Sequence, residues 1–459
     1  MSQSEALEGA GKSARILIRN ATILSMDTAV GNFQRASILV EGDQIMAVGL
    51  GTAPDIEFGS TQVIDAEGMI ALPGFIDAHR HVWQSPLSMA AADADLNSYF
   101  AAVPGKLAPV YEADDLRTAN HIGALQALNA GVTTIFDWCH VLHSPAHADA
   151  AIEGLLDSGI RAIFGYGFPN TETAWSMDSE RPVPNDIRRV RRERLTSDDA
   201  LVTMAMAARG PEQSTIEVTK HDMGVARDLD LLISLHAGNG AFGLPYRSVE
   251  RMYEEELLGA DVQYVHCNSL TDESIQRIAD SGGRMVSTPA IEMQMQFGYP
   301  ASTRFLAAGI RPGLGADVVT STGCSLFPQM ASAFQAARLQ ELEQGTPEIS
   351  TYDVLSFATV DGAESVGLAS KTGSLTPGKQ ADIVLLRPPA LTVMNDPIGF
   401  TVLGASTDCV DTVVVAGEIK KRDGALCGIE AGQLQMTLES CRDRLFERSG
   451  FQPPSSSFR

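Results

Sequence analysis

Eight short apolar runs, separated by helix-length segments, occupy the middle of the chain and constrain its fold more than any other feature. The runs lie at residues 71–81, 132–138, 161–168, 201–209, 231–238, 262–268, 284–290 and 311–317. Strands that alternate with helical segments form parallel sheets, and eight such units over roughly 300 residues match a (β/α)8 barrel with insertions. We therefore expect an α/β fold with a TIM-like barrel over residues 71–370, and a doubly wound sheet is the alternative.

The two ends of the chain carry β-type runs that neither end could bury alone. Alternating and β-branched residues fill 14–71, and the same texture returns at 373–388 and 409–424. Because a small sheet needs a partner for its apolar face, we expect an antiparallel unit from 14–70 to combine with 371–430 into one composite β-sandwich. Residues 431–459 are expected to form a C-terminal helix and tail.

The chain is strongly acidic, with a formal net charge of −23 at pH 7. A phosphate backbone or an anionic membrane surface repels such a protein, so we expect neither nucleic acid nor a membrane as a partner. The opening residues lack the apolar core of an export leader, and no apolar run of about 18 residues follows. The six cysteines are scattered without a CxxC pair, as is typical of reduced thiols. These features predict a cytoplasmic protein.

Four of the nine histidines fall at the carboxyl ends of predicted barrel strands. His79 and His81 end the first strand, His236 the fifth and His266 the sixth, while Asp317 ends the eighth. Because barrel enzymes place their active sites at this face, the five side chains are expected to converge. Imidazole nitrogen with one carboxylate oxygen suits zinc, iron, cobalt or manganese, so the pattern predicts a metal site.

Several longer motifs surround these residues: PGFIDAHRH (73–81), GVTTIFD (131–137), GLGAD (313–317) and LTPGKQADIVLL (375–386). With them the sequence resembles the amidohydrolase superfamily over nearly the whole chain. The resemblance implies a barrel with a composite β-sandwich, a bound metal and hydrolysis at carbon. It implies His79, His81, His236 and Asp317 as direct metal ligands, with His266 either binding the metal or polarising the substrate.

The resemblance also bears on the number of metal ions. Two-metal members of the superfamily carry a lysine at the end of the fourth strand, and LVTMAMAARG (201–210) has none. We therefore expect one divalent ion per subunit, zinc first, with iron, cobalt or manganese as alternatives. Such an ion lowers the pKa of its bound water to about 7, and Asp317 is the expected proton acceptor.

The chain departs from its ring-deaminating relatives after the fifth strand. Those relatives usually read H-x-x-E, where the glutamate protonates the ring, whereas this chain reads His236-Ala237-Gly238-Asn239. An amide cannot donate and recover a proton as a carboxylic acid does, although Asn239 can hydrogen-bond a carbonyl. After the seventh strand, Glu292 could return a carboxylate to the pocket; the alternative is a salt-bridged loop residue.

Within the superfamily, HRHVWQSPL (79–87) and LHAGNG (235–240) look like the phenylurea and molinate hydrolases, a branch suited to xenobiotic degradation. Those enzymes cleave a urea or thiocarbamate carbonyl rather than a ring carbon. The leading hypothesis is thus hydrolysis of an amide, urea or thiocarbamate bond in a small apolar molecule, which releases an amine or a thiol. A triazine or nucleobase-like aminohydrolase is the second hypothesis, and a catalytically silent metal-binding scaffold is the third.

Further residues are candidates for substrate contact. Trp83 and His143 follow the first two strands, and we expect them to join Asn239 and Glu292 around a small-molecule substrate. An apolar wall could also form; its candidates besides Trp83 are Tyr99, Phe100, Met293 and Met295. His140 and His147 could also line the mouth of the pocket, but their spacing favours ordinary loop or helix positions. Relatives commonly pair, so the resemblance also implies a homo-oligomer, a dimer or larger.

Overall fold

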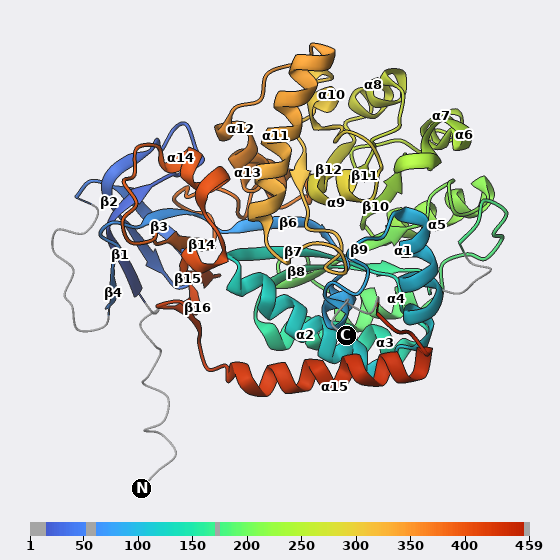
Figure 1. The fold of residues 1–459 in the computed structure, drawn as a ribbon, viewed down its shortest axis with the longest axis horizontal. Coiled ribbons are helices and arrows are strands. Elements are labelled where there is room, and N and C mark those ends of the chain that lie inside the picture. The colour runs from blue at the N-terminus through green and yellow to red at the C-terminus, as the bar shows by residue number, and fades with distance from the viewer. Residues whose placement is uncertain (1–14, 52–60, 170–174, 454–459) are drawn as a thin grey trace, which may run out of the picture.

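The structure is a computed structural model that describes residues 15–51, 61–169 and 175–453 (Figure 1). Residue 14, at the predicted start of the sandwich, and residues 454–459 of the predicted tail lie outside this range. Among the described residues, no helix combines the length and the apolar character needed to cross a bilayer.

Eight parallel strands form the barrel, in the order of their sequence. They are β6 (Phe75–Arg80), β7 (Val132–Cys139), β8 (Arg161–Gly167), β9 (Val202–Ala208), β10 (Leu232–Ala237), β11 (Val262–His266), β12 (Arg284–Ser287) and β13 (Gly313–Leu314). Nearly every residue of these strands is buried, because helices cover the outside of the barrel while side chains fill its interior. The predicted barrel is therefore confirmed, although its last two strands are shorter than expected.

The barrel closes where β13 approaches β6. Arg80 and Asp317 form an isolated parallel bridge across this seam. A Cβ atom at Gly315 would lie 2.5 Å from the His79 carbonyl oxygen, so only glycine allows the approach. The seam therefore brings the first and last strand ends, with His79 and Asp317, to the same place.

The prediction of one strand over residues 71–81 is wrong. The segment divides at Gly74 into β5 (Ile70–Pro73), which belongs to a separate sheet, and β6 of the barrel. A Cβ atom at Gly74 would lie 2.1 Å from the side chain of Thr133, so glycine is required where the chain passes between the sheets. An unbroken apolar run conceals this division, since both halves are buried.

A second sheet combines strands from both ends of the chain. Its strands are β1 (Arg15–Ile23), β2 (Phe33–Glu41), β3 (Gln44–Gly49), β4 (Thr61–Asp65), β5, β14 (Ile383–Leu386), β15 (Val410–Val415), β16 (Glu418–Arg422) and β17 (Ala425–Leu426). The two ends join where β5 and β14 pair antiparallel, with Pro73 opposite Ile383. The first five strands are not purely antiparallel as predicted, because β4 and β5 both run parallel to β1. The domain limits at residues 70 and 371 stay a prediction.

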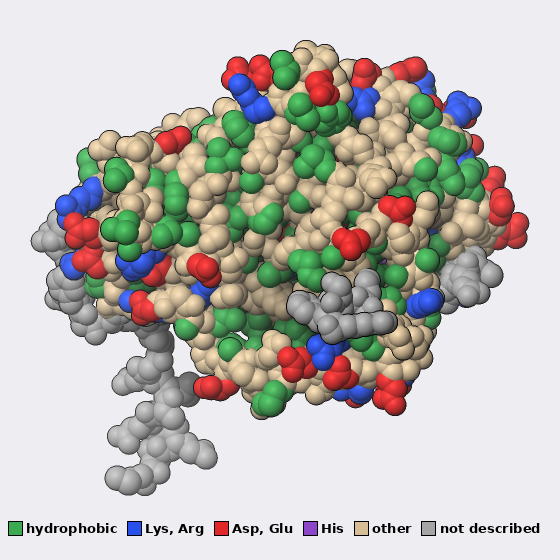
Figure 2. Space-filling model, viewed as in Figure 1, with side chains coloured by type: hydrophobic (Ala, Val, Ile, Leu, Met, Phe, Trp, Pro, Cys, Tyr) green, Lys and Arg blue, Asp and Glu red, His purple; other side chains and the backbone are tan. Residues whose placement is uncertain are grey.

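The helices lie mainly around the barrel (Figure 1). They are α1 (Leu96–Ala102), α2 (Ala113–Asn129), α3 (Pro145–Ser158), α4 (Asp186–Arg189), α5 (Ile216–Asp228), α6 (Gly243–Tyr246), α7 (Ser248–Glu254), α8 (Asp272–Asp280), α9 (Pro289–Gln294), α10 (Ser302–Ala307), α11 (Leu326–Gln344), α12 (Thr351–Phe357), α13 (Val360–Ser365), α14 (Pro397–Gly399) and α15 (Ala431–Ser449). The last helix crosses α2, where Arg444 and Arg448 both bind the buried Asp115. On the face drawn in Figure 2, basic side chains lie singly among acidic ones.

Candidate metal centre and active site

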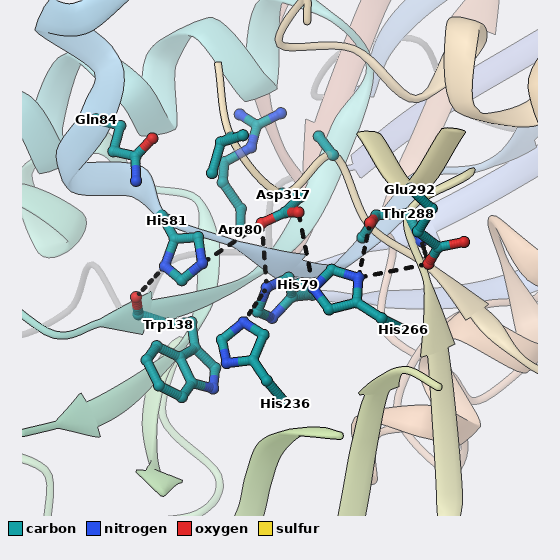
Figure 3. Close-up of polar contacts among 12 residues, drawn as sticks. His79, Arg80, His81, Gln84, Trp138, His236, His266, Thr288, Glu292 and Asp317 are labelled. Atoms are coloured by element: carbon teal, nitrogen blue, oxygen red, sulfur yellow. Dashed lines mark hydrogen bonds and ion pairs between the residues drawn. The ribbon is translucent and has the colours of Figure 1, made fainter. Parts of the chain in front are cut away.

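The five residues predicted to bind metal meet at the carboxyl-terminal end of the barrel (Figure 3). Asp317 Oδ1 lies 3.4 Å from His79 Nε2 and 3.4 Å from His81 Nε2. His236 Nε2 lies 3.3 Å from His79 Nε2, and His266 Nε2 lies 3.9 Å from Asp317 Oδ2. The structure thus brings together side chains from four barrel strands that are far apart in sequence.

The chemistry of these donors fits one divalent ion. Burial lowers the pKa values of His79, His81 and His236, so their imidazoles are neutral and keep a lone pair for a metal. Two ligands about 2.0–2.1 Å from one tetrahedral ion are roughly 3.4 Å apart, which is the spacing found here. The donor atoms of His79, His81 and Asp317 all lie within 4.8 Å of one another.

Backbone strain accompanies two of the five residues. His266 has a φ of 75° and Asp317 a φ of 60°, a left-handed conformation that non-glycine residues rarely adopt. Backbone hydrogen bonds hold Asp317 there, since its N–H donates to His79 and its carbonyl accepts from His81. Such conformations cost about 1–3 kcal/mol each and persist where the surrounding structure imposes them, often at functional sites.

Asp317 remains ionised in this setting. Burial alone would raise its pKa, but a hydrogen bond from His79 and the neighbouring imidazoles hold the pKa of Asp317 well below its usual range. A carboxylate is therefore available at neutral pH, both as a ligand and as an acceptor of protons.

Contacts behind the cluster fix two of the imidazole rings. His81 Nδ1 donates to the Trp138 carbonyl oxygen, 2.9 Å away. His266 Nδ1 lies 3.2 Å from Thr288 Oγ1 and 3.5 Å from Glu292 Oε1. Glu292 is completely buried and also accepts hydrogen bonds from the Ser287 hydroxyl and the Thr288 N–H. The structure therefore places Glu292 behind His266 (Figure 3), not among the residues that line the cavity.

A cavity of about 340 Å³ opens above the cluster. Its lining is largely aromatic and aliphatic, and Asp317 is its single carboxylate among the described residues. The residues that line it include His81, Leu96, Tyr99, Phe100, Pro104, Pro109, Trp138, His140, Trp175, Gln213, His236, Asn239, Phe242, His266, Met295, Phe297, Asp317 and Val318. A cavity of this kind suits a small, uncharged ligand.

The other predicted site residues are divided between this lining and the interior. Asn239 lines the cavity, as predicted. Trp83 is buried against Tyr111 and His140 instead. His143 is outside the lining, where its Nε2 donates to the Ala108 carbonyl oxygen. Of the apolar wall, Tyr99, Phe100 and Met295 line the cavity, whereas Met293 is exposed.

The sequence patterns do not single out Trp138, Glu212 or Gln213, and they favour an ordinary loop or helix position for His140. Trp138 lies in β7 and His140 directly follows it, where the strand-end rule that predicts the metal ligands also applies, and both residues line the cavity. Burial lowers the pKa of His140 to about 3, so its ring presents a neutral edge to the cavity. Glu212 and Gln213 follow β9, in a loop that carries no histidine or aspartate to mark it as part of the site. Burial raises the pKa of Glu212 to about 7.

Curated relatives resemble this chain over most of its length. A 5'-deoxyadenosine deaminase from Methanothermobacter thermautotrophicus is 27% identical, with 90% of this chain and 94% of that protein covered. A 5-methylthioadenosine/S-adenosylhomocysteine deaminase from Pelotomaculum thermopropionicum is 26% identical, with 95% and 100% covered.

Solved structures share the same fold. An adenosine deaminase from Xanthomonas campestris with bound zinc has a TM-score of 0.84 at 20% identity, and covers 94% of this chain and 98% of its own. The zinc complex of atrazine chlorohydrolase from Arthrobacter aurescens has a TM-score of 0.82 at 22% identity, and covers 93% and 100%. The amidohydrolase family model matches residues 70–420. Since that match spans the barrel, the whole histidine and aspartate cluster and the returning strands of the second sheet, the chain belongs to the amidohydrolase family.

Proposed function

We propose that this amidohydrolase releases ammonia or an amine from an amino-substituted, uncharged aromatic heterocycle. The observation that carries the proposal is a histidine and aspartate cluster at the floor of a cavity with largely apolar walls. Curated relatives that are adenosine-type deaminases support this reaction over the urea or thiocarbamate cleavage that the short sequence motifs favour.

His79, His81, His236 and Asp317 are the proposed ligands of one divalent ion. When bound, such an ion lowers the pKa of a water molecule to about 7 and polarises the bond under attack. Zinc is the first choice because similar structures contain it, while iron, cobalt and manganese suit the same donors.

Asp317 is the proposed proton carrier. Its ionised carboxylate accepts the proton of water as the new C–O bond forms, and returns it to the departing nitrogen as the C–N bond breaks. His266, whose Nδ1 side is fixed by Thr288 and Glu292, presents Nε2 toward the reacting centre. In the overall reaction one water molecule is consumed, the C–N bond breaks, a C–O bond forms, and ammonia or an amine leaves. Neither Asp317 nor His266 is changed at the end of the cycle.

The walls select the substrate by shape and polarity. The rings of His140 and Trp175 lie 5.4 Å apart, and those of Phe100 and Phe242 lie 6.2 Å apart; all four line the cavity. Aromatic walls favour a planar ring. A charged substituent on the substrate would lose its hydration without gaining an oppositely charged partner, since the Asp317 carboxylate already contacts the histidines of the cluster.

Cleavage of a urea or thiocarbamate is the second candidate, and Asn239 favours it. This amide lies in the cavity where ring deaminases of the superfamily carry a glutamate. Asn239 can donate a hydrogen bond to a carbonyl oxygen or a ring nitrogen, but it cannot protonate the ring.

The test uses purified protein loaded with zinc and a panel of an aminotriazine, an adenine nucleoside, a phenylurea and a thiocarbamate. Mass spectrometry of products and an ammonia assay report the bond that breaks. The proposal expects deamination of a ring substrate, and Asn239→Glu is expected to increase that rate at least about 10-fold by supplying the missing acid. Cleavage of ureas or thiocarbamates alone would establish the second candidate. The absence of turnover with every compound would favour the third hypothesis, a catalytically silent metal-binding scaffold.

A further inference from the structure

The loop between β10 and α7 brings two residues to the cavity. We call residues 238–248 the specificity loop, because Asn239 and Phe242 both line the cavity. The middle of the loop is partly exposed, with Leu244 67% exposed and Ala241, Pro245 and Arg247 also exposed, while Gly243 packs against Ser269. The placement of Asn239 and Phe242 therefore depends strongly on how the two ends of the loop are held.

Both ends of the specificity loop bind one carboxylate oxygen. Glu212 Oε1 accepts a hydrogen bond from the Gly238 N–H at 2.8 Å and another from the Ser248 hydroxyl at 2.7 Å. Glu212 is 4% exposed and Ser248 is fully buried, so water does not compete for these bonds. Glu212 comes from the loop after β9, and a neighbouring barrel unit thus holds the specificity loop.

The Gly238 peptide is fixed from its other side as well. Its carbonyl oxygen accepts hydrogen bonds from the Ser269 N–H at 2.9 Å and the Ser269 hydroxyl at 2.7 Å. Gly238 has a φ of +60°, and a Cβ atom there would lie 2.7 Å from the Leu270 side chain. The direction in which the chain leaves β10 toward Asn239 is therefore determined by these contacts.

We propose that Glu212 is a positioning residue, which holds Asn239 and Phe242 against the substrate and so determines which substrates the site accepts. Glu212 is not among the residues that line the cavity, and its action passes through the loop. This inference rests on the proposed function only in that the cavity binds the substrate. Removal of the carboxylate leaves two buried donors without their acceptor, which is costly enough to shift the loop.

The variants are Glu212→Ala, Glu212→Gln and, as a matched control, Glu217→Ala on the exposed face of α5. The glutamine keeps an oxygen that accepts both hydrogen bonds, whereas alanine keeps neither. Hydrogen–deuterium exchange of residues 238–248 is measured first, because it requires no substrate. We expect at least about 10-fold faster exchange in Glu212→Ala, and wild-type exchange in Glu212→Gln and Glu217→Ala. Unchanged exchange in Glu212→Ala overturns the proposal.

Kinetics with the substrate found on the panel then separate positioning from general stability. Glu212→Ala is expected to raise KM about 10-fold, with a smaller change in kcat and unchanged zinc content. In the Asn239→Ala background the same substitution should raise KM less than about 3-fold, because the effects of residues that act through each other are not additive. An equal increase in KM in the two backgrounds overturns the proposal. If Glu212→Ala does not fold, Ser248→Ala removes one of the two hydrogen bonds and is judged by the same two criteria.

If no compound is turned over, the proposed function fails, yet the exchange experiment still decides whether Glu212 holds the loop. If turnover is found and the exchange is unchanged, Glu212 has no positioning role and the proposed function stands.

Discussion

The floor of the cavity is made by residues at the ends of barrel strands, whereas its walls come mainly from the loops between the strands. The floor residues His79, His81 and Asp317 are tied to one another and to the barrel seam by backbone bonds. Wall residues such as Phe242 reach the cavity from a loop whose two ends are held by hydrogen bonds to Glu212. The floor is thus fixed by the fold, and the walls are free to differ between members that share it.

This difference is tested most severely by Asp317→Asn. The amide still faces the imidazoles but accepts no proton, so we expect kcat to fall by about 10³-fold or more. Because the histidines remain, zinc measured by mass spectrometry should stay near one ion per chain. Ligand binding, followed by quenching of tryptophan fluorescence, should hardly change, since the walls are intact. Full activity in this variant would rule out the proposed role of Asp317.

Phe242→Ala alters a wall of the cavity and leaves the residues of its floor unchanged. Removal of the ring takes apolar surface away from the substrate, so KM should rise about 10-fold while kcat and zinc content change little. Leu244→Ala in the same loop is the control, because Leu244 is 67% exposed and is not part of the lining. A large loss of kcat from Phe242→Ala would mean that wall and floor are not separable.

The smallest expected effect is on the pH dependence of stability. Glu212, which lies behind the wall of the cavity, and Asp317, on its floor, are expected to affect this dependence in opposite directions. Burial raises the pKa of Glu212 from 4.5 to about 7, so the folded state favours its protonated form. That contribution to stability is complete below pH 4.5 and is lost as the pH rises through 7. Glu212→Gln has no such dependence, so its Tm relative to wild type should increase between about pH 5 and about pH 8.

The upper limit of this effect is on the order of 3 kcal/mol. Asp317 behaves in the opposite way, since its lowered pKa contributes stability that is lost only in acid. A Tm difference that does not change with pH would show that Glu212 titrates near its ordinary pKa in the folded protein.

The sequence predicts the floor better than the walls for the same physical reason. His236 and His266 were identifiable because a barrel brings all its strand ends to one face, whatever the loops do. Glu292 was singled out, but its place behind His266 depends on how the short helix α9 turns, which no local pattern reveals. Glu212 was missed because its importance lies in contacts with residues 26 and 36 positions away. The division at Gly74 was missed because its cause is the Thr133 side chain, on another strand.

The pairing of β5 with β14 also has a consequence for synthesis on the ribosome. Roughly 300 residues separate Pro73 from its partner Ile383, which is about 15–60 s of translation at ~5–20 residues per second. Throughout that interval β5 has an unpaired edge, because the strands that complete the second sheet have not yet been synthesised. Nascent chains of this protein therefore expose an unpaired strand edge until translation is nearly finished, and such an edge is a template for pairing with other chains.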